Sequence, residues 1–198
     1  MNKLLIAIIV IIILGAGWYF VSPLFLSTTV EDKFPFSVPT EEEFEQMTDE
    51  EKFELEMKML EEAAKQPDVV MEETMPAEGV TPETEPAALA SGEFKDADSF
   101  HKGSGDATIY RLPDGERLLR MENFDVTNGP DLRVLLVKNS DPMSRSDVGD
   151  DYIELGKLKG NKGNQNYEIP DDVDVDEYGS VVIYCKPFHV IFSTATLN

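Results

Sequence analysis

The sequence has little cysteine, histidine and positive charge. Its 198 residues include one cysteine and two histidines, and 17 basic residues stand against 39 acidic ones, for a net charge of −22. One cysteine excludes a disulfide within the chain and a four-cysteine metal site, and two histidines exclude a three-histidine zinc site in one copy. The excess of negative charge argues against binding to nucleic acid and against docking on anionic lipids through a basic patch.

A long stretch of residues near the N-terminus also lacks charged side chains. Residues 4–21 contain no charged residue, and the apolar run continues to Leu26. A helix over residues 4–26 would be about 34 Å long, enough to cross a hydrocarbon core of about 30 Å. The sequence therefore predicts a cytoplasmic tip and a single transmembrane anchor helix in residues 1–26.

The charges on either side of this run predict its orientation. Lys3 precedes the run, whereas Glu31 and Asp32 follow it. By the positive-inside rule, we expect the N-terminus in the cytoplasm and everything after residue 27 outside the plasma membrane. The alternative is cleavage after Gly17, which would remove the anchor.

Most of the negative charge lies in residues 27–91, which we interpret as an acidic spacer. This segment contains 19 acidic residues and four lysines. Its second part, residues 66–91, has four prolines and no aromatic residue. Such a segment buries too little apolar area to offset the entropy of ordering, so we expect a flexible tether there.

The first part of the spacer carries helix signals. Thr40 and Thr48 are each followed three residues later by Glu, as in a capping box. An apolar stripe then recurs at helical spacing: Phe53, Met57, Leu60 and Ala64. These signals predict a helix over about residues 40–65, whose stripe rests on the chain's own domain or pairs with a second copy of the chain.

From residue 92 onward, short apolar runs alternate with turn residues. Proline, glycine and asparagine between the runs favour chain reversals. The pattern predicts an all-β domain over residues 92–198, an antiparallel β-sandwich or barrel. The apolar runs at 181–185 and 189–192 are typical of central strands, and Lys186-Pro187-Phe188 would join them as a hairpin.

Cys185 is the first candidate for chemistry. It ends an apolar run, which is typical of a small buried side chain in a sheet. A redox thiol or a ligand would instead need a lowered pKa or a bound metal, because the thiolate is the reactive form. The residues alone leave both interpretations open.

The two histidines are the next candidates. His101 precedes the first strong strand, in a turn, where a lone histidine is commonly a surface residue or a satisfied hydrogen bonder; the alternative is an axial haem ligand or a partner of Cys185. His189 follows Cys185 by four residues, but the second histidine and the methionine of a cupredoxin copper loop do not follow it. No metal site is predicted from these spacings.

Five motifs occur in a fixed order in residues 92–198. They are GEF at 92–94, His101 followed by GSG at 103–105, MENFDVTNGPDLRVLL at 121–136, LGKLKGNKGNQNYEIP at 155–170 and SVVIYCKPFHVIFSTATL at 180–197. Together they resemble the electron-transfer domain family called DM-thirteen. The resemblance covers the whole C-terminal domain and neither the anchor nor the spacer.

This resemblance implies a β-rich extracytoplasmic domain with one characteristic cysteine, which here is Cys185. It also implies a redox role through the bare thiol or through a bound prosthetic group such as haem, with His101 as the histidine before the first strand. Members of the family often accompany DOMON and cytochrome b-type domains. The resemblance gives His189 no role.

Two functions follow as hypotheses. The first is a membrane-anchored extracytoplasmic module that takes part in redox chemistry through Cys185, with His101 as a second participant and an unidentified redox or cell-surface protein as partner. The second is a binding or adhesion module in which Cys185 is structural. Both describe an electron-transfer or binding module more than a stand-alone enzyme.

Overall fold

The computed structural model describes residues 39–76 and 85–198, so the predicted anchor of residues 4–26 lies outside the described residues. No helix in these two ranges is long and apolar enough to cross a membrane. The helices are α2 (Glu41–Gln46), α3 (Asp49–Ala63), α4 (Arg145–Val148) and the 3-10 helix η1 (Val175–Glu177). The strands are β1 (Val70–Glu72), β2 (Ala87–Asp96), β3 (Gly103–Arg111), β4 (Arg117–Val126), β5 (Leu132–Val137), β6 (Tyr152–Lys157), β7 (Lys162–Ile169), β8 (Ser180–Cys185) and β9 (Val190–Thr196).

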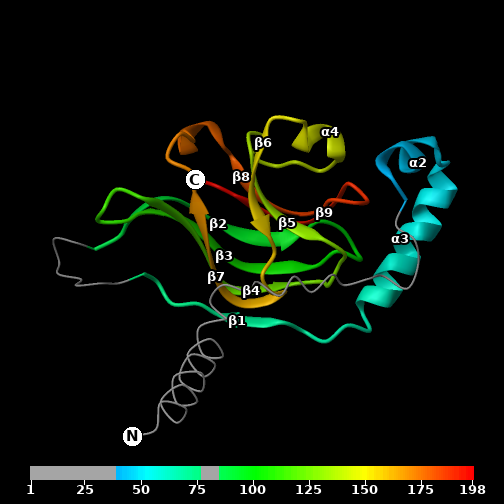
Figure 1. Cartoon of the computed structure of the whole chain (residues 1–198), viewed down its shortest axis with the longest axis horizontal. Coiled ribbons are helices and arrows are strands. Elements are labelled where there is room, and N and C mark those ends of the chain that lie inside the picture. Colours follow the sequence, from blue (N-terminus) through cyan, green and yellow to red (C-terminus); the bar gives the residue numbers. More distant parts are fainter. Residues whose placement is uncertain (1–38, 77–84) are drawn as a thin grey trace, which may run out of the picture. The chain divides into compact units, whose positions relative to one another are not determined.

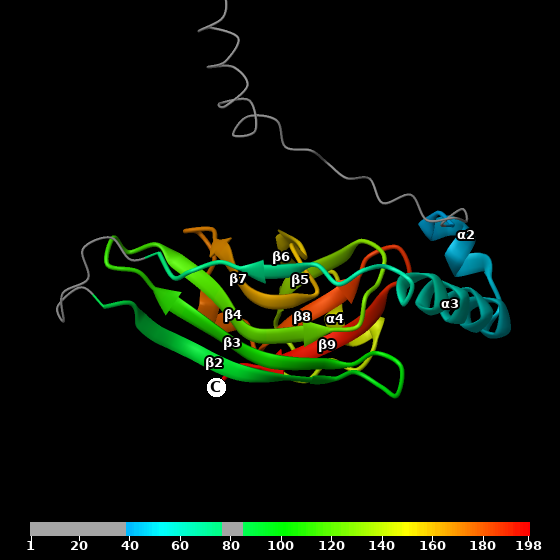
Figure 2. The same cartoon turned by 90° about the horizontal axis from the view of Figure 1, so that it is seen from below.

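The strands form one sheet in the order β1-β7-β4-β3-β2-β9-β8-β5-β6. Neighbouring strands are antiparallel except β1 and β7, which are parallel. The sheet curls into a half-barrel, and α2 and α3 lie at one end of it (Figures 1 and 2). The prediction of a mostly antiparallel β domain is confirmed, with a single curled sheet in place of a closed barrel or a two-sheet sandwich.

The two most apolar runs form the middle of the sheet. β8 and β9 are antiparallel neighbours between β5 and β2, and the turn between them includes Pro187, so the predicted central hairpin is confirmed. All six residues of β8 are buried. Alternate side chains point to opposite faces of a strand, and both faces are covered here. Val181, Ile183 and Cys185 join the main core cluster, whereas Val182 and Tyr184 join a second cluster with Val148 of α4.

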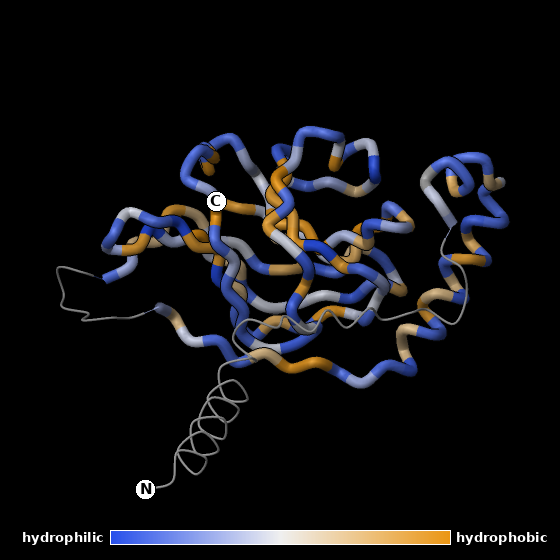
Figure 3. Tube along the Cα trace, in the orientation of Figure 1, coloured by the Kyte–Doolittle hydropathy of each residue, from blue (hydrophilic) through white to orange (hydrophobic). Residues whose placement is uncertain are grey.

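The predicted spacer helix consists of two helices. Thr40 and Thr48 both form complete capping boxes, and the second box begins α3 directly after α2 ends. Hydrophilic positions dominate both helices (Figure 3). Met59 and Ala63 are buried, so α3 rests on the chain's own domain. Self-association through this helix stays a prediction.

The apolar stripe predicted for this helix docks only in part. Leu60 of the stripe packs against the main core cluster, but Phe53 is 55% exposed and Ala64 is also exposed. The deeper contacts come from a neighbouring row, in which Met59 and Ala63 are buried and Leu55 packs against the same cluster. Residues four apart lie on one face of a helix, so both sets form rows. The row that docks is the one whose side chains fit the end of the half-barrel. The hydropathy of the helix alone does not predict which row this is.

The prediction of a flexible tether over residues 66–91 is wrong for two of its stretches, because each of them belongs to a strand of the sheet. Val70–Glu72 is strand β1, and β2 begins at Ala87, before the predicted domain boundary at residue 92. A low apolar content does not prevent ordering here, because β1 is held by backbone hydrogen bonds to β7. Gly163 of β7 has a φ of 94° and lies so close to Met71 that any Cβ would overlap the Met71 carbonyl group.

Candidate functional site

Cys185 is sealed in the main core at the end of β8. Its side chain has no exposed surface, and its thiol donates a hydrogen bond to the carbonyl oxygen of Pro130 at 3.2 Å. Burial raises the pKa of the Cys185 thiol, and the negative charges of Asp131 and Glu56 raise it further, against a lowering hydrogen bond from the Phe188 backbone. The environment therefore favours the neutral thiol over the reactive thiolate.

His101 lies in the connection from β2 to β3 and is also fully buried. Its ring packs on Phe192 with the ring centroids 4.3 Å apart. Asp98 holds the ring from one side, because its Oδ2 atom lies 2.7 Å from Nδ1. Its Oδ1 atom accepts hydrogen bonds from the backbone amides of Phe100 and His101, both at 2.7 Å. These contacts fix the position and the orientation of the imidazole.

The carboxyl group of Asp98 is suited to this role. Its partial burial opposes ionisation, but the hydrogen bonds from the His101 ring and from the two backbone amides lower its pKa. An ionised carboxylate only accepts hydrogen bonds, so the Nδ1 atom that faces it carries the proton. The second nitrogen of His101, Nε2, is then the ring atom left to face Glu56.

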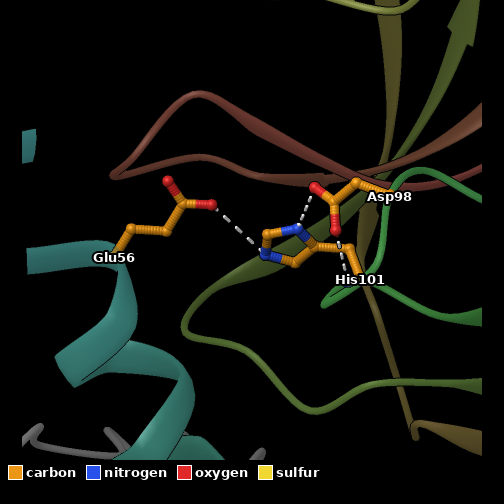
Figure 4. A group of neighbouring side chains, drawn as sticks. All are labelled: Glu56, Asp98 and His101. Carbon is orange, nitrogen blue, oxygen red and sulfur yellow. Dashed lines mark hydrogen bonds and ion pairs between the residues drawn. The ribbon is translucent and has the colours of Figure 1, made fainter. Parts of the chain in front are cut away.

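The Nε2 atom of His101 points toward Glu56 of α3 (Figure 4). Nε2 lies 3.7 Å from the Oε1 atom of Glu56, and no hydrogen-bond partner for it occurs among the described residues. Burial raises the pKa of the Glu56 carboxyl, and the charge of Asp98 adds to this while His101 opposes it. Glu56, Asp98 and His101 thus form a polar cluster between α3 and the end of the sheet.

The structure brings the two predicted site residues to the same end of the half-barrel. Glu56 faces His101 and also acts through its charge on Cys185. Phe192, which contacts the His101 ring, belongs to the core cluster that includes Cys185. Their hydrogen bonds nevertheless go to different groups, the thiol to Pro130 and the imidazole to Asp98.

His189 lies in the turn after Cys185, with a positive φ of 55°. Its Nδ1 atom is 3.2 Å from the hydroxyl of Tyr184, and its ring is 6.1 Å from those of Tyr184 and Phe44. These contacts place His189 at the outer end of the β8–β9 hairpin.

Sequence reasoning missed Glu56 and Asp98. Asp98 had a signal, because an aspartate that precedes a turn by two or three residues commonly accepts backbone hydrogen bonds there. Glu56 had none, since it is one of many glutamates in the acidic spacer. Only the docking of α3 distinguishes it from its neighbours.

The residues do not fit a haem in this arrangement. The Cys185 sulfur is enclosed by the core and already bonded to Pro130. Nε2 of His101 is buried with Glu56 directly opposite. In the part of the chain that the structure describes, neither atom faces an open space in which a flat macrocycle could lie.

No curated protein and no solved structure matches this chain. The sequence profile of the family described as "Electron transfer DM13" matches residues 93–197, which is 105 of the 198 residues. The match runs from β2 to β9 and includes both Cys185 and His101. The chain therefore belongs to the electron transfer DM13 family.

Proposed function

We propose that this protein is an electron-transfer module displayed on the outer side of the plasma membrane. The observation that carries the proposal is the family match, which covers the whole strand-rich domain. The uncharged run at residues 4–26 supports a membrane anchor, and the charges around it support an extracytoplasmic domain. Its redox partner would be another protein at the membrane surface.

Within this proposal, Cys185 is the redox-active residue and His101 is its second participant. The thiol is neutral and covered in the described arrangement, so Cys185 is expected to resist small alkylating reagents in the native protein. A sealed thiol is protected from adventitious oxidants outside the cell. Access to it requires movement of the turn after β8 or of α3.

The experiment is a potentiometric titration of the full chain in detergent micelles, after expression with iron and copper supplied. A redox-active metal ion bound through Cys185 would give a reversible couple in the optical or electron paramagnetic resonance signal, which we expect to be lost or shifted in Cys185→Ala. Val182→Ala is the matched control, because Val182 is an equally buried residue of the same strand in the other core cluster. A wild-type chain without any reversible couple would contradict the proposal.

A second candidate function is a binding or adhesion module with a structural cysteine. The burial and raised pKa of Cys185 favour it, and so does an apolar surface groove lined by Phe53, Met57, Leu60 and Phe100. Under this function, Cys185→Ala loses stability only, and the wild type shows no couple. The same titration therefore separates the two functions.

A further inference from the structure

The Nε2 atom of His101 is a buried polar atom without a hydrogen-bond partner in residues 39–76 and 85–198. Leaving such an atom unpartnered costs free energy, so its situation requires an explanation. The nearest opposing group, Oε1 of Glu56, lies 3.7 Å away, too far for a hydrogen bond. In the neutral imidazole with its proton on Nδ1, Nε2 carries a lone pair, and a cation can join this lone pair to the carboxylate across the gap.

Asp98 completes an arrangement found around metal ions. Histidines that bind a metal usually donate their other ring N–H to a carboxylate, which fixes the tautomer and raises the basicity of the ligating nitrogen. Asp98 contacts Nδ1 of His101 at 2.7 Å and is itself held by two backbone amides. The ring is therefore oriented before any ion arrives.

The distances suit a small transition-metal ion. Two atoms that each lie about 2.1 Å from a tetrahedral zinc ion are about 3.4 Å apart. The 3.7 Å between Nε2 of His101 and Oε1 of Glu56 needs little adjustment to reach this value. One ligand atom each from Glu56, Asp98 and His101 lies within 4.8 Å of the other two.

We propose that His101 and Glu56 bind a divalent transition-metal ion such as Zn²⁺, with Asp98 as the residue that orients the imidazole. A nitrogen and an oxygen ligand favour such ions over Mg²⁺ and Ca²⁺, which prefer oxygen alone. The side chain of Glu56 is 28% exposed, so water can reach the carboxylate side and complete the coordination.

The ion would also act on the fold. Glu56 belongs to α3, and His101 to the connection between β2 and β3. An ion shared by the two residues would fasten α3 to the end of the half-barrel that contains Cys185. This inference does not depend on electron transfer, because Zn²⁺ has no redox chemistry.

The test uses the full chain in detergent micelles, with Co²⁺ as a visible probe of the zinc site and Mg²⁺ in excess to occupy the acidic surface. We expect one Co²⁺ per chain, displaced by Zn²⁺. Glu56→Gln and His101→Ala should each weaken binding at least about 10-fold, and Asp98→Asn about 10- to 100-fold. Two matched controls should bind as the wild type: Glu54→Gln, at an exposed position of the same helix, and His189→Ala.

A further readout is hydrogen exchange in α3, which Zn²⁺ should slow in the wild type and not in Glu56→Gln. Glu56 is only partly buried, so this variant keeps the test valid even if His101→Ala does not fold. Unchanged Co²⁺ binding in both Glu56→Gln and His101→Ala would overturn the proposal. So would a wild-type chain that binds no Co²⁺ in excess Mg²⁺, which would leave His101 and Glu56 as an ion pair only.

Discussion

Helix α3 and strand β1 belong to the same acidic segment but attach to the β domain in different ways. α3 buries an apolar row, in which Met59 has no exposed surface. β1 buries little, since Val70 is 58% exposed, and it pairs in parallel with β7. The difference shows that a polar segment can dock on a domain without adding to its core, provided that a sheet edge supplies partners for its backbone.

Side chains of the β domain reinforce the attachment of β1. The Oδ1 atom of Asn161 accepts a hydrogen bond from the Val69 amide at 2.7 Å, and its Nδ2 atom donates to Asp68 at 2.8 Å. Further along, Lys159 binds both carboxylate oxygens of Glu73, at 2.9 and 3.0 Å. The attachment of β1 is thus directional and partly ionic, whereas that of α3 depends mainly on apolar contact.

The largest effect is expected from Met59→Ala. Removing a buried methionine side chain costs about 2–5 kcal/mol, and here the loss falls on the docking of α3. Because α3 covers the end of the half-barrel that contains Cys185, the thiol should react faster with an alkylating reagent in this variant. Alkylation rates followed by mass spectrometry measure the change.

Met57→Ala is the control for this prediction, since Met57 lies on the same helix but lines the surface groove. It should leave the alkylation rate close to that of the wild type. Equal rates in Met59→Ala and the wild type would show that α3 does not protect Cys185.

Asn161→Ala tests the other attachment and should have a smaller effect. The substitution leaves the Val69 amide without its partner, which costs about 1–3 kcal/mol. Hydrogen exchange should accelerate in residues 69–72 and stay unchanged in α3. Asn198→Ala is the control, because that side chain makes only a 3.5 Å contact near the C-terminus. Acceleration in both segments would mean that the two attachments are coupled.

Much of the fold could be predicted from the sequence, because its signals are local. The apolar runs specified β8 and β9, and the two capping boxes specified the starts of α2 and α3. β1 could not be predicted in this way. Its three residues carry no apolar alternation, and their partner is β7, a strand about 90 residues later in the chain that would be the edge of the sheet without β1.

The candidate site was predictable only in part, because one of its residues is brought to it by a contact between segments that are far apart in the sequence. Cys185 and His101 were recognised because each is rare in this chain, and the resemblance singled out the same two residues. Glu56 lies opposite His101 because α3 docks mainly through the row of Leu55, Met59 and Ala63, while Phe53 of the predicted stripe stays exposed. Choosing between two rows of one helix requires the shape of the surface beneath it.

The smallest expected effect is a pH dependence that separates the two attachments. Partial burial of Glu73 opposes its ionisation, but hydrogen bonds from the Lys159 side chain and the Asn166 backbone amide lower its pKa. A hydrogen bond from the side-chain amide of Asn161 lowers the pKa of Asp68. Carboxyl groups with a lowered folded-state pKa stabilise the docked strand above their unfolded values, about 4.3 for Glu and 3.9 for Asp. This stabilisation is lost as the pH falls through the folded values, so acid should loosen β1.

α3 docks through the apolar side chains of Met59 and Ala63. Glu56, which faces the β domain from α3, has a pKa raised by burial, so its protonation in acid removes no stabilisation of the docked helix. Glu51 has a pKa lowered by its hydrogen bond from the Thr48 backbone, but it is exposed at the start of α3, so acid should disturb Met59 and Ala63 less than β1. Amide chemical shifts of Val70–Glu72 and of α3, followed from about pH 6 to about pH 3 at low salt, measure the difference, because salt screens exposed ion pairs. Glu73→Gln should reduce the pH dependence of the β1 signals, since it removes one of the two titrating groups and keeps a hydrogen-bonding side chain. The contrary result is that the signals of β1 and α3 change at the same pH, both in the wild type and in Glu73→Gln. β1 and α3 would then detach together, although one is held by ionic hydrogen bonds and the other by apolar contacts.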